Sequence, residues 1–319
     1  MKTSADIERR ATSDRVDRAD GVGVALVAAG ATGYGVTIVL GRALADDGVG
    51  PATALGIRFA LAAAFLLGLA AARRSPLLPA PGERTRVFLL GAIGYATEST
   101  LFYMALERGT AASAALLFYA YPLMVTVAEL ALGWAPLRTR VLLALAASAG
   151  GTVLVVASGD ELGISSVGMV CALASAAAFA AYLLACTRLV HRSDQLARAA
   201  WVAVGASVAS LTRGLASHDL ASPGGHWPVL VVYGAATALA FACIFAGLAR
   251  LGASRTAVVM TLEAFVAVAL GAAFLGEPLV AAQLVGGTAI VAAAAVIARS
   301  RPQAVAPRAR HPHESVENP

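Results

Sequence analysis

The feature that most constrains this chain is a series of ten apolar runs separated by short polar segments. The runs cover residues 23–41, 51–72, 85–106, 110–133, 139–157, 164–187, 196–216, 227–248, 253–275 and 280–298. About 20 apolar residues in an α-helix are enough to cross the hydrocarbon core of a bilayer. The runs therefore predict an all-α polytopic membrane protein with ten transmembrane helices.

The composition agrees with this prediction, because 59% of the residues are hydrophobic and only 13% are charged. A soluble domain carries about 25% charged residues. A globular core of this length could not hide so much apolar surface from water, so lipid must be the solvent. The three cysteines, Cys171, Cys186 and Cys243, lie in apolar runs without ligand spacing. Neither a disulfide framework nor a zinc site is expected.

Both ends of the chain are polar. Residues 1–22 mix acidic and basic side chains over a longer stretch than the first part of a cleaved signal peptide. Residues 300–319 are rich in Pro and polar residues and cannot form a packed core. We expect both segments to be disordered cytoplasmic tails.

The basic residues predict the orientation in the membrane. Of the 23 Lys and Arg residues at or beyond the ends of the expected helices, 20 fall on the side that also holds both termini. The other side holds only Arg42, Arg108 and Arg213. Basic residues resist translocation, so both termini should be cytoplasmic in a multi-pass protein of the inner or plasma membrane. The basic residues lie in separate short loops, so no nucleic-acid partner is expected.

A unit of two helices recurs after 142 residues. The matched residues are Leu106 with Leu248, Arg108 with Arg250, and Pro136-Leu137 with Pro278-Leu279. The repeat divides the chain into two five-helix halves, residues 23–157 and 164–299. Because five is odd, the halves would have opposite orientations in the membrane, which is a recurring design of secondary transporters. A duplication kept for packing alone is the alternative.

Five short motifs suggest a family. They are I-R-F at 57–59, L-L-F-Y-A-Y-P-L at 116–123, L-G-A-S-R-T-A at 251–257, T-L-E-A at 261–264 and F-L-G-E-P-L at 274–279. With these motifs, residues 24–299 resemble the EamA-type family of the drug/metabolite transporter superfamily. The chain departs from the family where Ala264 follows Glu263 in place of the usual Pro. The first half also has L-G-W-A-P-L at 132–137, without a counterpart of Glu277.

The resemblance implies a carrier that moves a small metabolite, often an exported amino acid or similar polar solute, by alternating access. The expected partners are this solute and the lipid bilayer; a homodimer stays open. The sequence contains no H-E-x-x-H, G-x-S-x-G, Cys-x-x-Cys or Walker motif, so we expect no enzyme, cofactor or metal. A non-transporting scaffold or subunit of a membrane complex is the alternative function.

Three ionisable residues lie deep within the runs, namely Arg58, Glu98 and Glu263. Such groups are costly in a membrane and usually face the bundle interior or an aqueous cavity. We expect both glutamates to point into a central substrate pathway, Glu263 being the deeper. Arg58 could extend its side chain to the outer surface or pair with Glu98. The aromatic candidates for the pathway are Tyr34, Tyr95, Tyr119 and Tyr121.

One proline interrupts the run at 110–133. Pro122 lacks an N–H donor, and its ring crowds the carbonyl group of Phe118, four residues earlier. The sequence therefore predicts a helix kink at Pro122 beside the pathway, with no equal kink at Ala264.

Overall fold

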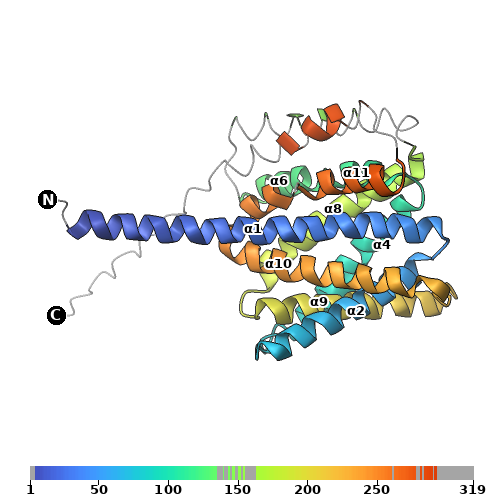
Figure 1. Ribbon diagram of the computed structural model, residues 1–319, viewed down its shortest axis with the longest axis horizontal. Coiled ribbons are helices and arrows are strands. Elements are labelled where there is room, and N and C mark those ends of the chain that lie inside the picture. Colours follow the sequence, from blue (N-terminus) through green and yellow to red (C-terminus); the bar gives the residue numbers. More distant parts are fainter. Residues whose placement is uncertain are drawn as a thin grey trace, which may run out of the picture.

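The computed structural model describes residues 4–134, 163–260 and 262–277, with scattered residues in 139–154 and 281–292. Every regular element in this part of the chain is helical (Figure 1). The elements are α1 Ser4–Asp46, α2 Pro51–Ala72, α3 Arg84–Leu89, a π-helical turn Leu90–Tyr95, α4 Ala96–Leu106, α5 Ala111–Phe118, α6 Tyr121–Ala131, α8 Ser166–Leu189, α9 Gln195–Ala216, a 3-10 turn Gly224–His226, α10 Trp227–Met260 and α11 Leu262–Phe274.

Seven helical segments are long and apolar enough to cross a membrane. They are Gly21–Asp46, Pro51–Ala72, Arg84–Leu106, Ala111–Ala131, Ser166–Leu189, Gln195–Ala216 and Gly224–Leu251. Residues Phe265–Phe274 form a shorter apolar helix. The expected helices at 139–157 and 280–298 fall largely outside the described residues. The described part is thus that of a multi-pass membrane protein.

Two helices extend further than the sequence led us to expect. Helix α1 begins at Ser4, within the segment expected to be disordered. Extending an existing helix adds one hydrogen bond per ordered residue and avoids a new nucleation step, which favours such continuation. Helix α10 continues to Met260, through the expected turn between residues 248 and 253. That stretch contains Ala, Leu and Arg, which are strong helix formers, and no proline.

The described turns gather at two ends of the bundle. At one end, which we call the Arg108 end, the Ser165 N–H donates to the Arg108 carbonyl group at 3.0 Å. The Ala221 N–H donates there to Thr53 Oγ1 at 3.1 Å. At the opposite end, which we call the Glu83 end, the Ala80 N–H donates to Ser193 Oγ at 3.0 Å. Successive membrane segments therefore run between the two ends.

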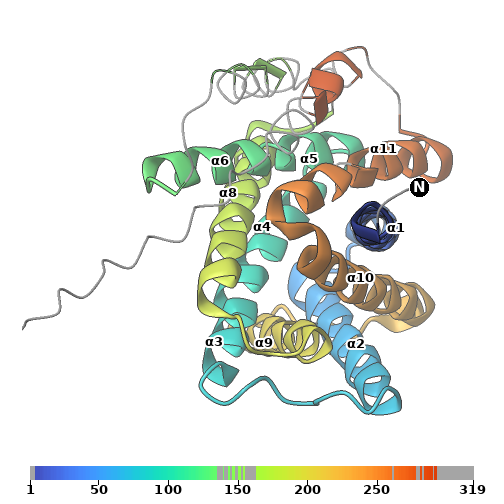
Figure 2. The ribbon, with the colours of Figure 1, turned by 90° about the vertical axis from the view of Figure 1, so that its left-hand side faces the viewer.

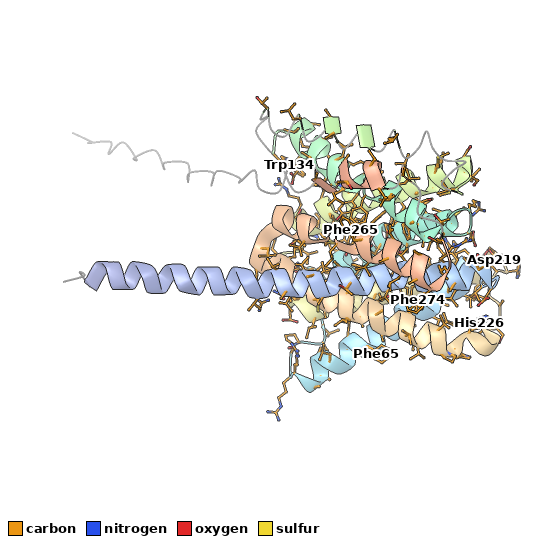
Figure 3. The ribbon with its side chains drawn as sticks, turned by 45° about the horizontal axis from the view of Figure 1, so that its top comes forward. Phe65, Trp134, Asp219, His226, Phe265 and Phe274 are labelled. Carbon is orange, nitrogen blue, oxygen red and sulfur yellow. The ribbon has the colours of Figure 1, made fainter. Side chains whose placement is uncertain are left out.

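The outer surface of the bundle carries large apolar side chains. Phe65, Phe265 and Phe274 are 42%, 54% and 76% exposed and point away from the bundle (Figure 3). Apolar surface on this scale is unfavourable in water, and its exposure is consistent with contact to lipid. His226 and Asp219 lie at the Arg108 end in the same view.

Close backbone contact fixes the π-helical turn against α9. A Cβ atom added at Gly91 would overlap the Val202 carbonyl group, and one added at Gly205 would overlap the Phe88 carbonyl group. Small residues allow membrane helices to approach in this way. Figure 2, which looks along the bundle, shows α3 and α9 side by side at its lower edge. The contact anchors the segment that carries Tyr95 and, three residues later, Glu98.

Candidate functional site: a central cavity

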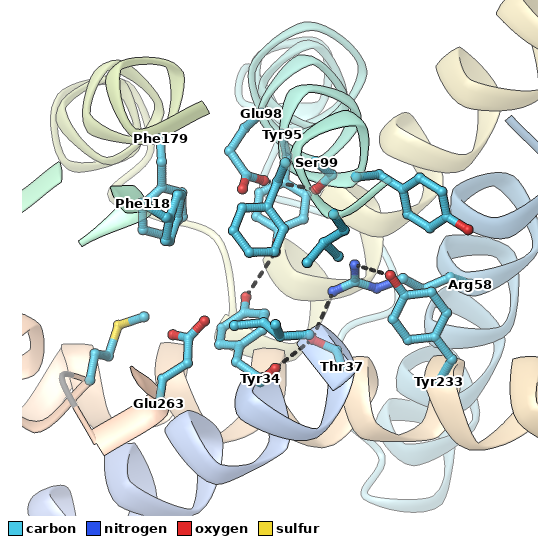
Figure 4. A pocket seen from close by; sticks show the side chains of 15 residues that line it. Tyr34, Thr37, Arg58, Tyr95, Glu98, Ser99, Phe118, Phe179, Tyr233 and Glu263 are labelled. Carbon is cyan, nitrogen blue, oxygen red and sulfur yellow. Dashed lines mark hydrogen bonds between the residues drawn. The ribbon is translucent and has the colours of Figure 1, made fainter. Parts of the chain in front are cut away.

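A cavity of about 40 Å³ lies inside the bundle (Figure 4). Five of the residues singled out from the sequence line it, namely Tyr34, Arg58, Tyr95, Glu98 and Glu263. The other lining residues are Thr37, Ile38, Ser99, Phe102, Tyr103, Leu106, Phe118, Phe179, Tyr233 and Met260. The fold thus brings three ionisable side chains, from α2, α4 and α11, to one cavity.

Arg58 of α2 is held inside the bundle and is only 7% exposed. Its Nε donates to Thr237 Oγ1 at 2.7 Å, and its terminal nitrogens donate to Tyr233 Oη at 3.0 Å and Thr37 Oγ1 at 3.4 Å. The side chain therefore does not extend to the outer surface. No ion pair joins it to Glu98 among the described contacts.

The partners of Arg58 are neutral, so its positive charge has no direct counter-charge. A guanidinium group has five N–H donors. The three hydrogen bonds to hydroxyl groups fix the plane of the group and leave further donors for an anionic ligand. Arg58 can therefore bind a carboxylate in the cavity with charge-assisted hydrogen bonds.

Glu98 lies in the first turn of α4, directly after the π-helical turn. Single π-helical turns are often found at functional sites, because they shift the register of the side chains that follow. Ser99 Oγ donates to Glu98 Oε2 at 2.7 Å, and Ser175 Oγ donates to Glu98 Oε1 at 3.4 Å. These partners orient the carboxyl group without supplying a positive charge.

Glu263 lies in the first turn of α11 and is 4% exposed. Its Oε2 atom is buried and accepts no hydrogen bond from the described residues. A buried acceptor without a partner is costly, and a ligand that donates a hydrogen bond would remove that cost. A hydrogen-bond donor on a ligand would therefore stabilise Glu263 more than Glu98, whose two oxygens already have partners.

Four tyrosines were expected near the pathway, and the structure divides them into two pairs. Tyr34 and Tyr95 line the cavity, where the Tyr95 hydroxyl donates to Tyr34 Oη at 3.1 Å. Tyr119 and Tyr121 are buried just behind the lining. The Tyr119 hydroxyl donates to the Met260 carbonyl group at 2.7 Å. The Tyr121 ring lies 4.9 Å from that of Phe179, so this pair supports the cavity wall.

The run that contains Pro122 is interrupted next to the cavity. Helix α5 ends at Phe118 and α6 begins at Tyr121, with Pro122 in its first turn. Tyr119 and Ala120 separate the two helices. Pro122 has no N–H group to donate to the carbonyl group of Phe118, four residues earlier. At the matched place in the second half, α10 ends at Met260 and α11 begins at Leu262, with Ala264 in its first turn. Thr261, between them, lies outside the described residues, so the absence of a kink at Ala264 stays a prediction.

The sequence analysis missed the hydroxyl groups that hold Arg58. Tyr233 and Thr237 stand four residues apart on α10, and Thr37 faces them from α1. Polar residues at this spacing share one face of a helix, which was the available signal. In the part of the chain that is described, no three His, Cys, Asp or Glu side chains cluster closely enough to hold a metal ion.

A comparison with protein families identifies the chain. A model described as "EamA-like transporter family" matches it twice, at residues 21–157 and 166–299. The chain belongs to the EamA-like transporter family. Membership of this family agrees with the apolar helices and with a central cavity that contains ionisable side chains. A search of curated proteins found no match.

Solved structures support the fold of this EamA-like protein. One, titled only "Crystal structure of protein", is 23% identical in sequence and superposes with a TM-score of 0.60. The match covers 83% of this chain and 95% of the other. At that identity the likeness concerns the fold alone.

Proposed function

We propose that this EamA-like protein is a secondary transporter that moves a small polar metabolite, such as an amino acid, by alternating access. In this proposal ten transmembrane helices form two inverted five-helix halves, both termini are cytoplasmic and the solute is exported. The observation that carries it is the central cavity, which is lined by one guanidinium group and two carboxyl groups that form no ion pair with one another.

The arrangement of charges favours a solute with both an acidic and an amino group. Arg58 offers free N–H donors to a carboxylate, while Glu263 offers an unused acceptor to an ammonium group. Glu98 supplies a second acidic group on the lining. A zwitterion would pair Arg58 with its carboxylate and Glu263 with its ammonium group, while Glu98 keeps its hydrogen bonds to Ser99 and Ser175.

The proposed orientation rests on the excess of basic residues on one side and on the alternation of the turns. A cysteine in place of Ser222, at the Arg108 end, should react with an impermeant thiol reagent from outside. A cysteine in place of Leu78, at the Glu83 end, should react only from inside. Labelling of both positions from the same side would contradict the topology.

Counterflow in proteoliposomes tests transport without any assumption about energy coupling. Vesicles are loaded with an unlabelled amino acid, a primary amine or a simple carboxylate, and uptake of the same labelled solute is followed. We expect saturable exchange of an amino acid that exceeds exchange of either single-charge solute. Exchange equal to that of empty vesicles for the whole panel would favour the non-transporting scaffold.

A further inference from the structure

A carboxylate joins the two halves of the chain at the Arg108 end. Glu277 Oε1 accepts the Ala111 N–H at 2.7 Å, and Oε2 accepts the Ala112 N–H at 3.2 Å. These N–H groups belong to the first turn of α5, where no intrahelical acceptor is available to them. A negative charge at that position is also favoured by the helix dipole. Glu277 thus caps a helix of the other half.

The backbone after α11 is shaped for this contact. The chain turns at Gly276, whose φ of 65° favours glycine, and the Glu277 N–H donates to the Gly271 carbonyl group at 3.3 Å. A Cβ atom added at Gly271 would lie 2.7 Å from Glu277 Oε2. The same atom would be 3.8 Å from the Ala111 Cβ. Glycine at position 271 therefore leaves room for the carboxylate between α11 and α5.

The contact lies over a separate apolar cluster at the same end. This cluster includes Ile38 of α1, Leu106 of α4, Ala115 of α5 and Ala267 of α11. Ile38 and Leu106 also line the central cavity. The cluster, which contains side chains from both halves, thus adjoins the cavity at the Arg108 end, and Glu277 adds a polar contact between the same two halves.

The repeat predicts no equal contact at the other end. At the offset of 142 residues, Glu277 corresponds to Ala135 and Ala111 corresponds to Ala253. Residues 130–159 contain neither Asp nor Glu. The first half therefore has no carboxylate in this segment. Ala253 also lies within α10, which continues to Met260, so no helix begins there that a carboxylate could cap.

We infer that Glu277 is a latch that holds the Arg108 end closed and biases the empty protein toward the state that opens at the Glu83 end. The inference rests on the proposed alternating access. Opening the Arg108 end would separate α11 from α5 and break both hydrogen bonds of Glu277. The reverse transition has no matching carboxylate contact to break, so the two states differ in free energy.

Two-sided labelling of a cavity residue measures this bias without any solute. The reporter is Phe102→Cys in a chain whose three native cysteines are replaced by Ser. Sealed vesicles are exposed to an impermeant thiol reagent from the outside or the inside. For Glu277→Ala we expect about a tenfold rise in the ratio of outside to inside labelling rates, the size expected for losing a charged hydrogen-bond acceptor. Glu277→Asp should restore much of the native ratio.

Two further variants keep the test decisive. Glu107→Ala removes an exposed carboxylate at the same end and should leave the ratio unchanged. Glu277→Gln keeps one acceptor oxygen and removes the charge, so its ratio should lie between those of the native protein and Glu277→Ala. This variant decides the outcome if Glu277→Ala does not insert. An unchanged ratio in both Glu277→Ala and Glu277→Gln, or equal acceleration from both sides, would overturn the latch.

The same measurement separates the latch from the proposed transport function. A shifted ratio in vesicles that show no counterflow would keep the latch and refute transport of the tested solutes. An unchanged ratio in vesicles with normal counterflow would refute the latch and leave the transport function in place.

Discussion

Glu83 and Glu263 are buried to almost the same extent, with exposed fractions of 6% and 4%, yet their surroundings differ. The Glu83 carboxylate accepts the N–H groups of His191, Arg192 and Ser193 at 2.8, 3.0 and 2.9 Å, and the Ser193 hydroxyl at 2.6 Å. Glu263 leaves one oxygen without a partner. The exposed fraction alone therefore does not distinguish the two carboxylates. Glu83 lies at one end of the bundle with its oxygens fully bonded, whereas Glu263 lines the central cavity with one oxygen available to a ligand.

The pKa of Glu83 reflects this difference. Burial alone would raise the pKa of this carboxyl group. The hydrogen bonds from the Ser193 hydroxyl and from the N–H groups of residues 191–193 outweigh that effect and lower the pKa to about 2. The ionised form is thus the one that the folded protein stabilises at the Glu83 end.

The largest effect on stability is expected from Glu83→Ala. The substitution leaves three backbone N–H groups of the α8–α9 loop without their acceptor, and should lower the free energy of unfolding by about 3 kcal/mol. Thermal unfolding in detergent measures it. Glu107→Ala, which removes an exposed ion pair with Arg108, should cost less than about 1 kcal/mol. Equal losses in the two variants would show that the Glu83 contact does not stabilise the fold.

Acid should weaken the same contact. Because the folded pKa of Glu83 lies below the ordinary value of 4.5, its contribution is complete above that value. The contribution decreases as the pH falls from 4.5 toward about 2. Glu83→Gln has no such proton to gain, so the difference in melting temperature between native protein and variant should shrink between about pH 6 and about pH 3. A constant difference over that range would contradict the assignment.

In the cavity the expected effect is on transport. Glu263→Gln keeps the shape of the side chain and removes its charge, so the protein should fold and insert while exchange falls about a hundredfold, the loss expected for a buried charged contact to solute. Counterflow rates, normalised to inserted protein, measure it. Glu129→Gln serves as the control, because Glu129 lies in α6 and does not line the cavity. Normal exchange in Glu263→Gln would reduce the residue to a packing role.

The sequence predicted the membrane class, the family and five of the cavity residues, because apolar runs and isolated charges are local signals. It could not predict what Arg58 contacts, since Tyr233 and Thr237 reach it across 175 and 179 residues of sequence. It also gave no sign that Glu83 binds a loop more than 100 residues away, since backbone acceptors and donors are not encoded by residue type. The length of α10 was missed because Arg250 and Gly252 separate the apolar runs at 227–248 and 253–275.

The smallest of these effects is expected for Glu98→Gln. Glu98 already accepts hydrogen bonds from Ser99 and Ser175, and a glutamine oxygen can still accept one of them. The loss is then confined to the attraction between this carboxylate and a cationic group in the cavity, which should slow exchange about tenfold. Because the carboxylate would act through charge, single-charge amines should be affected more than the matching neutral solutes. If Glu98→Gln slowed exchange as much as Glu263→Gln, the number of hydrogen-bond partners would not predict which cavity carboxylate binds the solute.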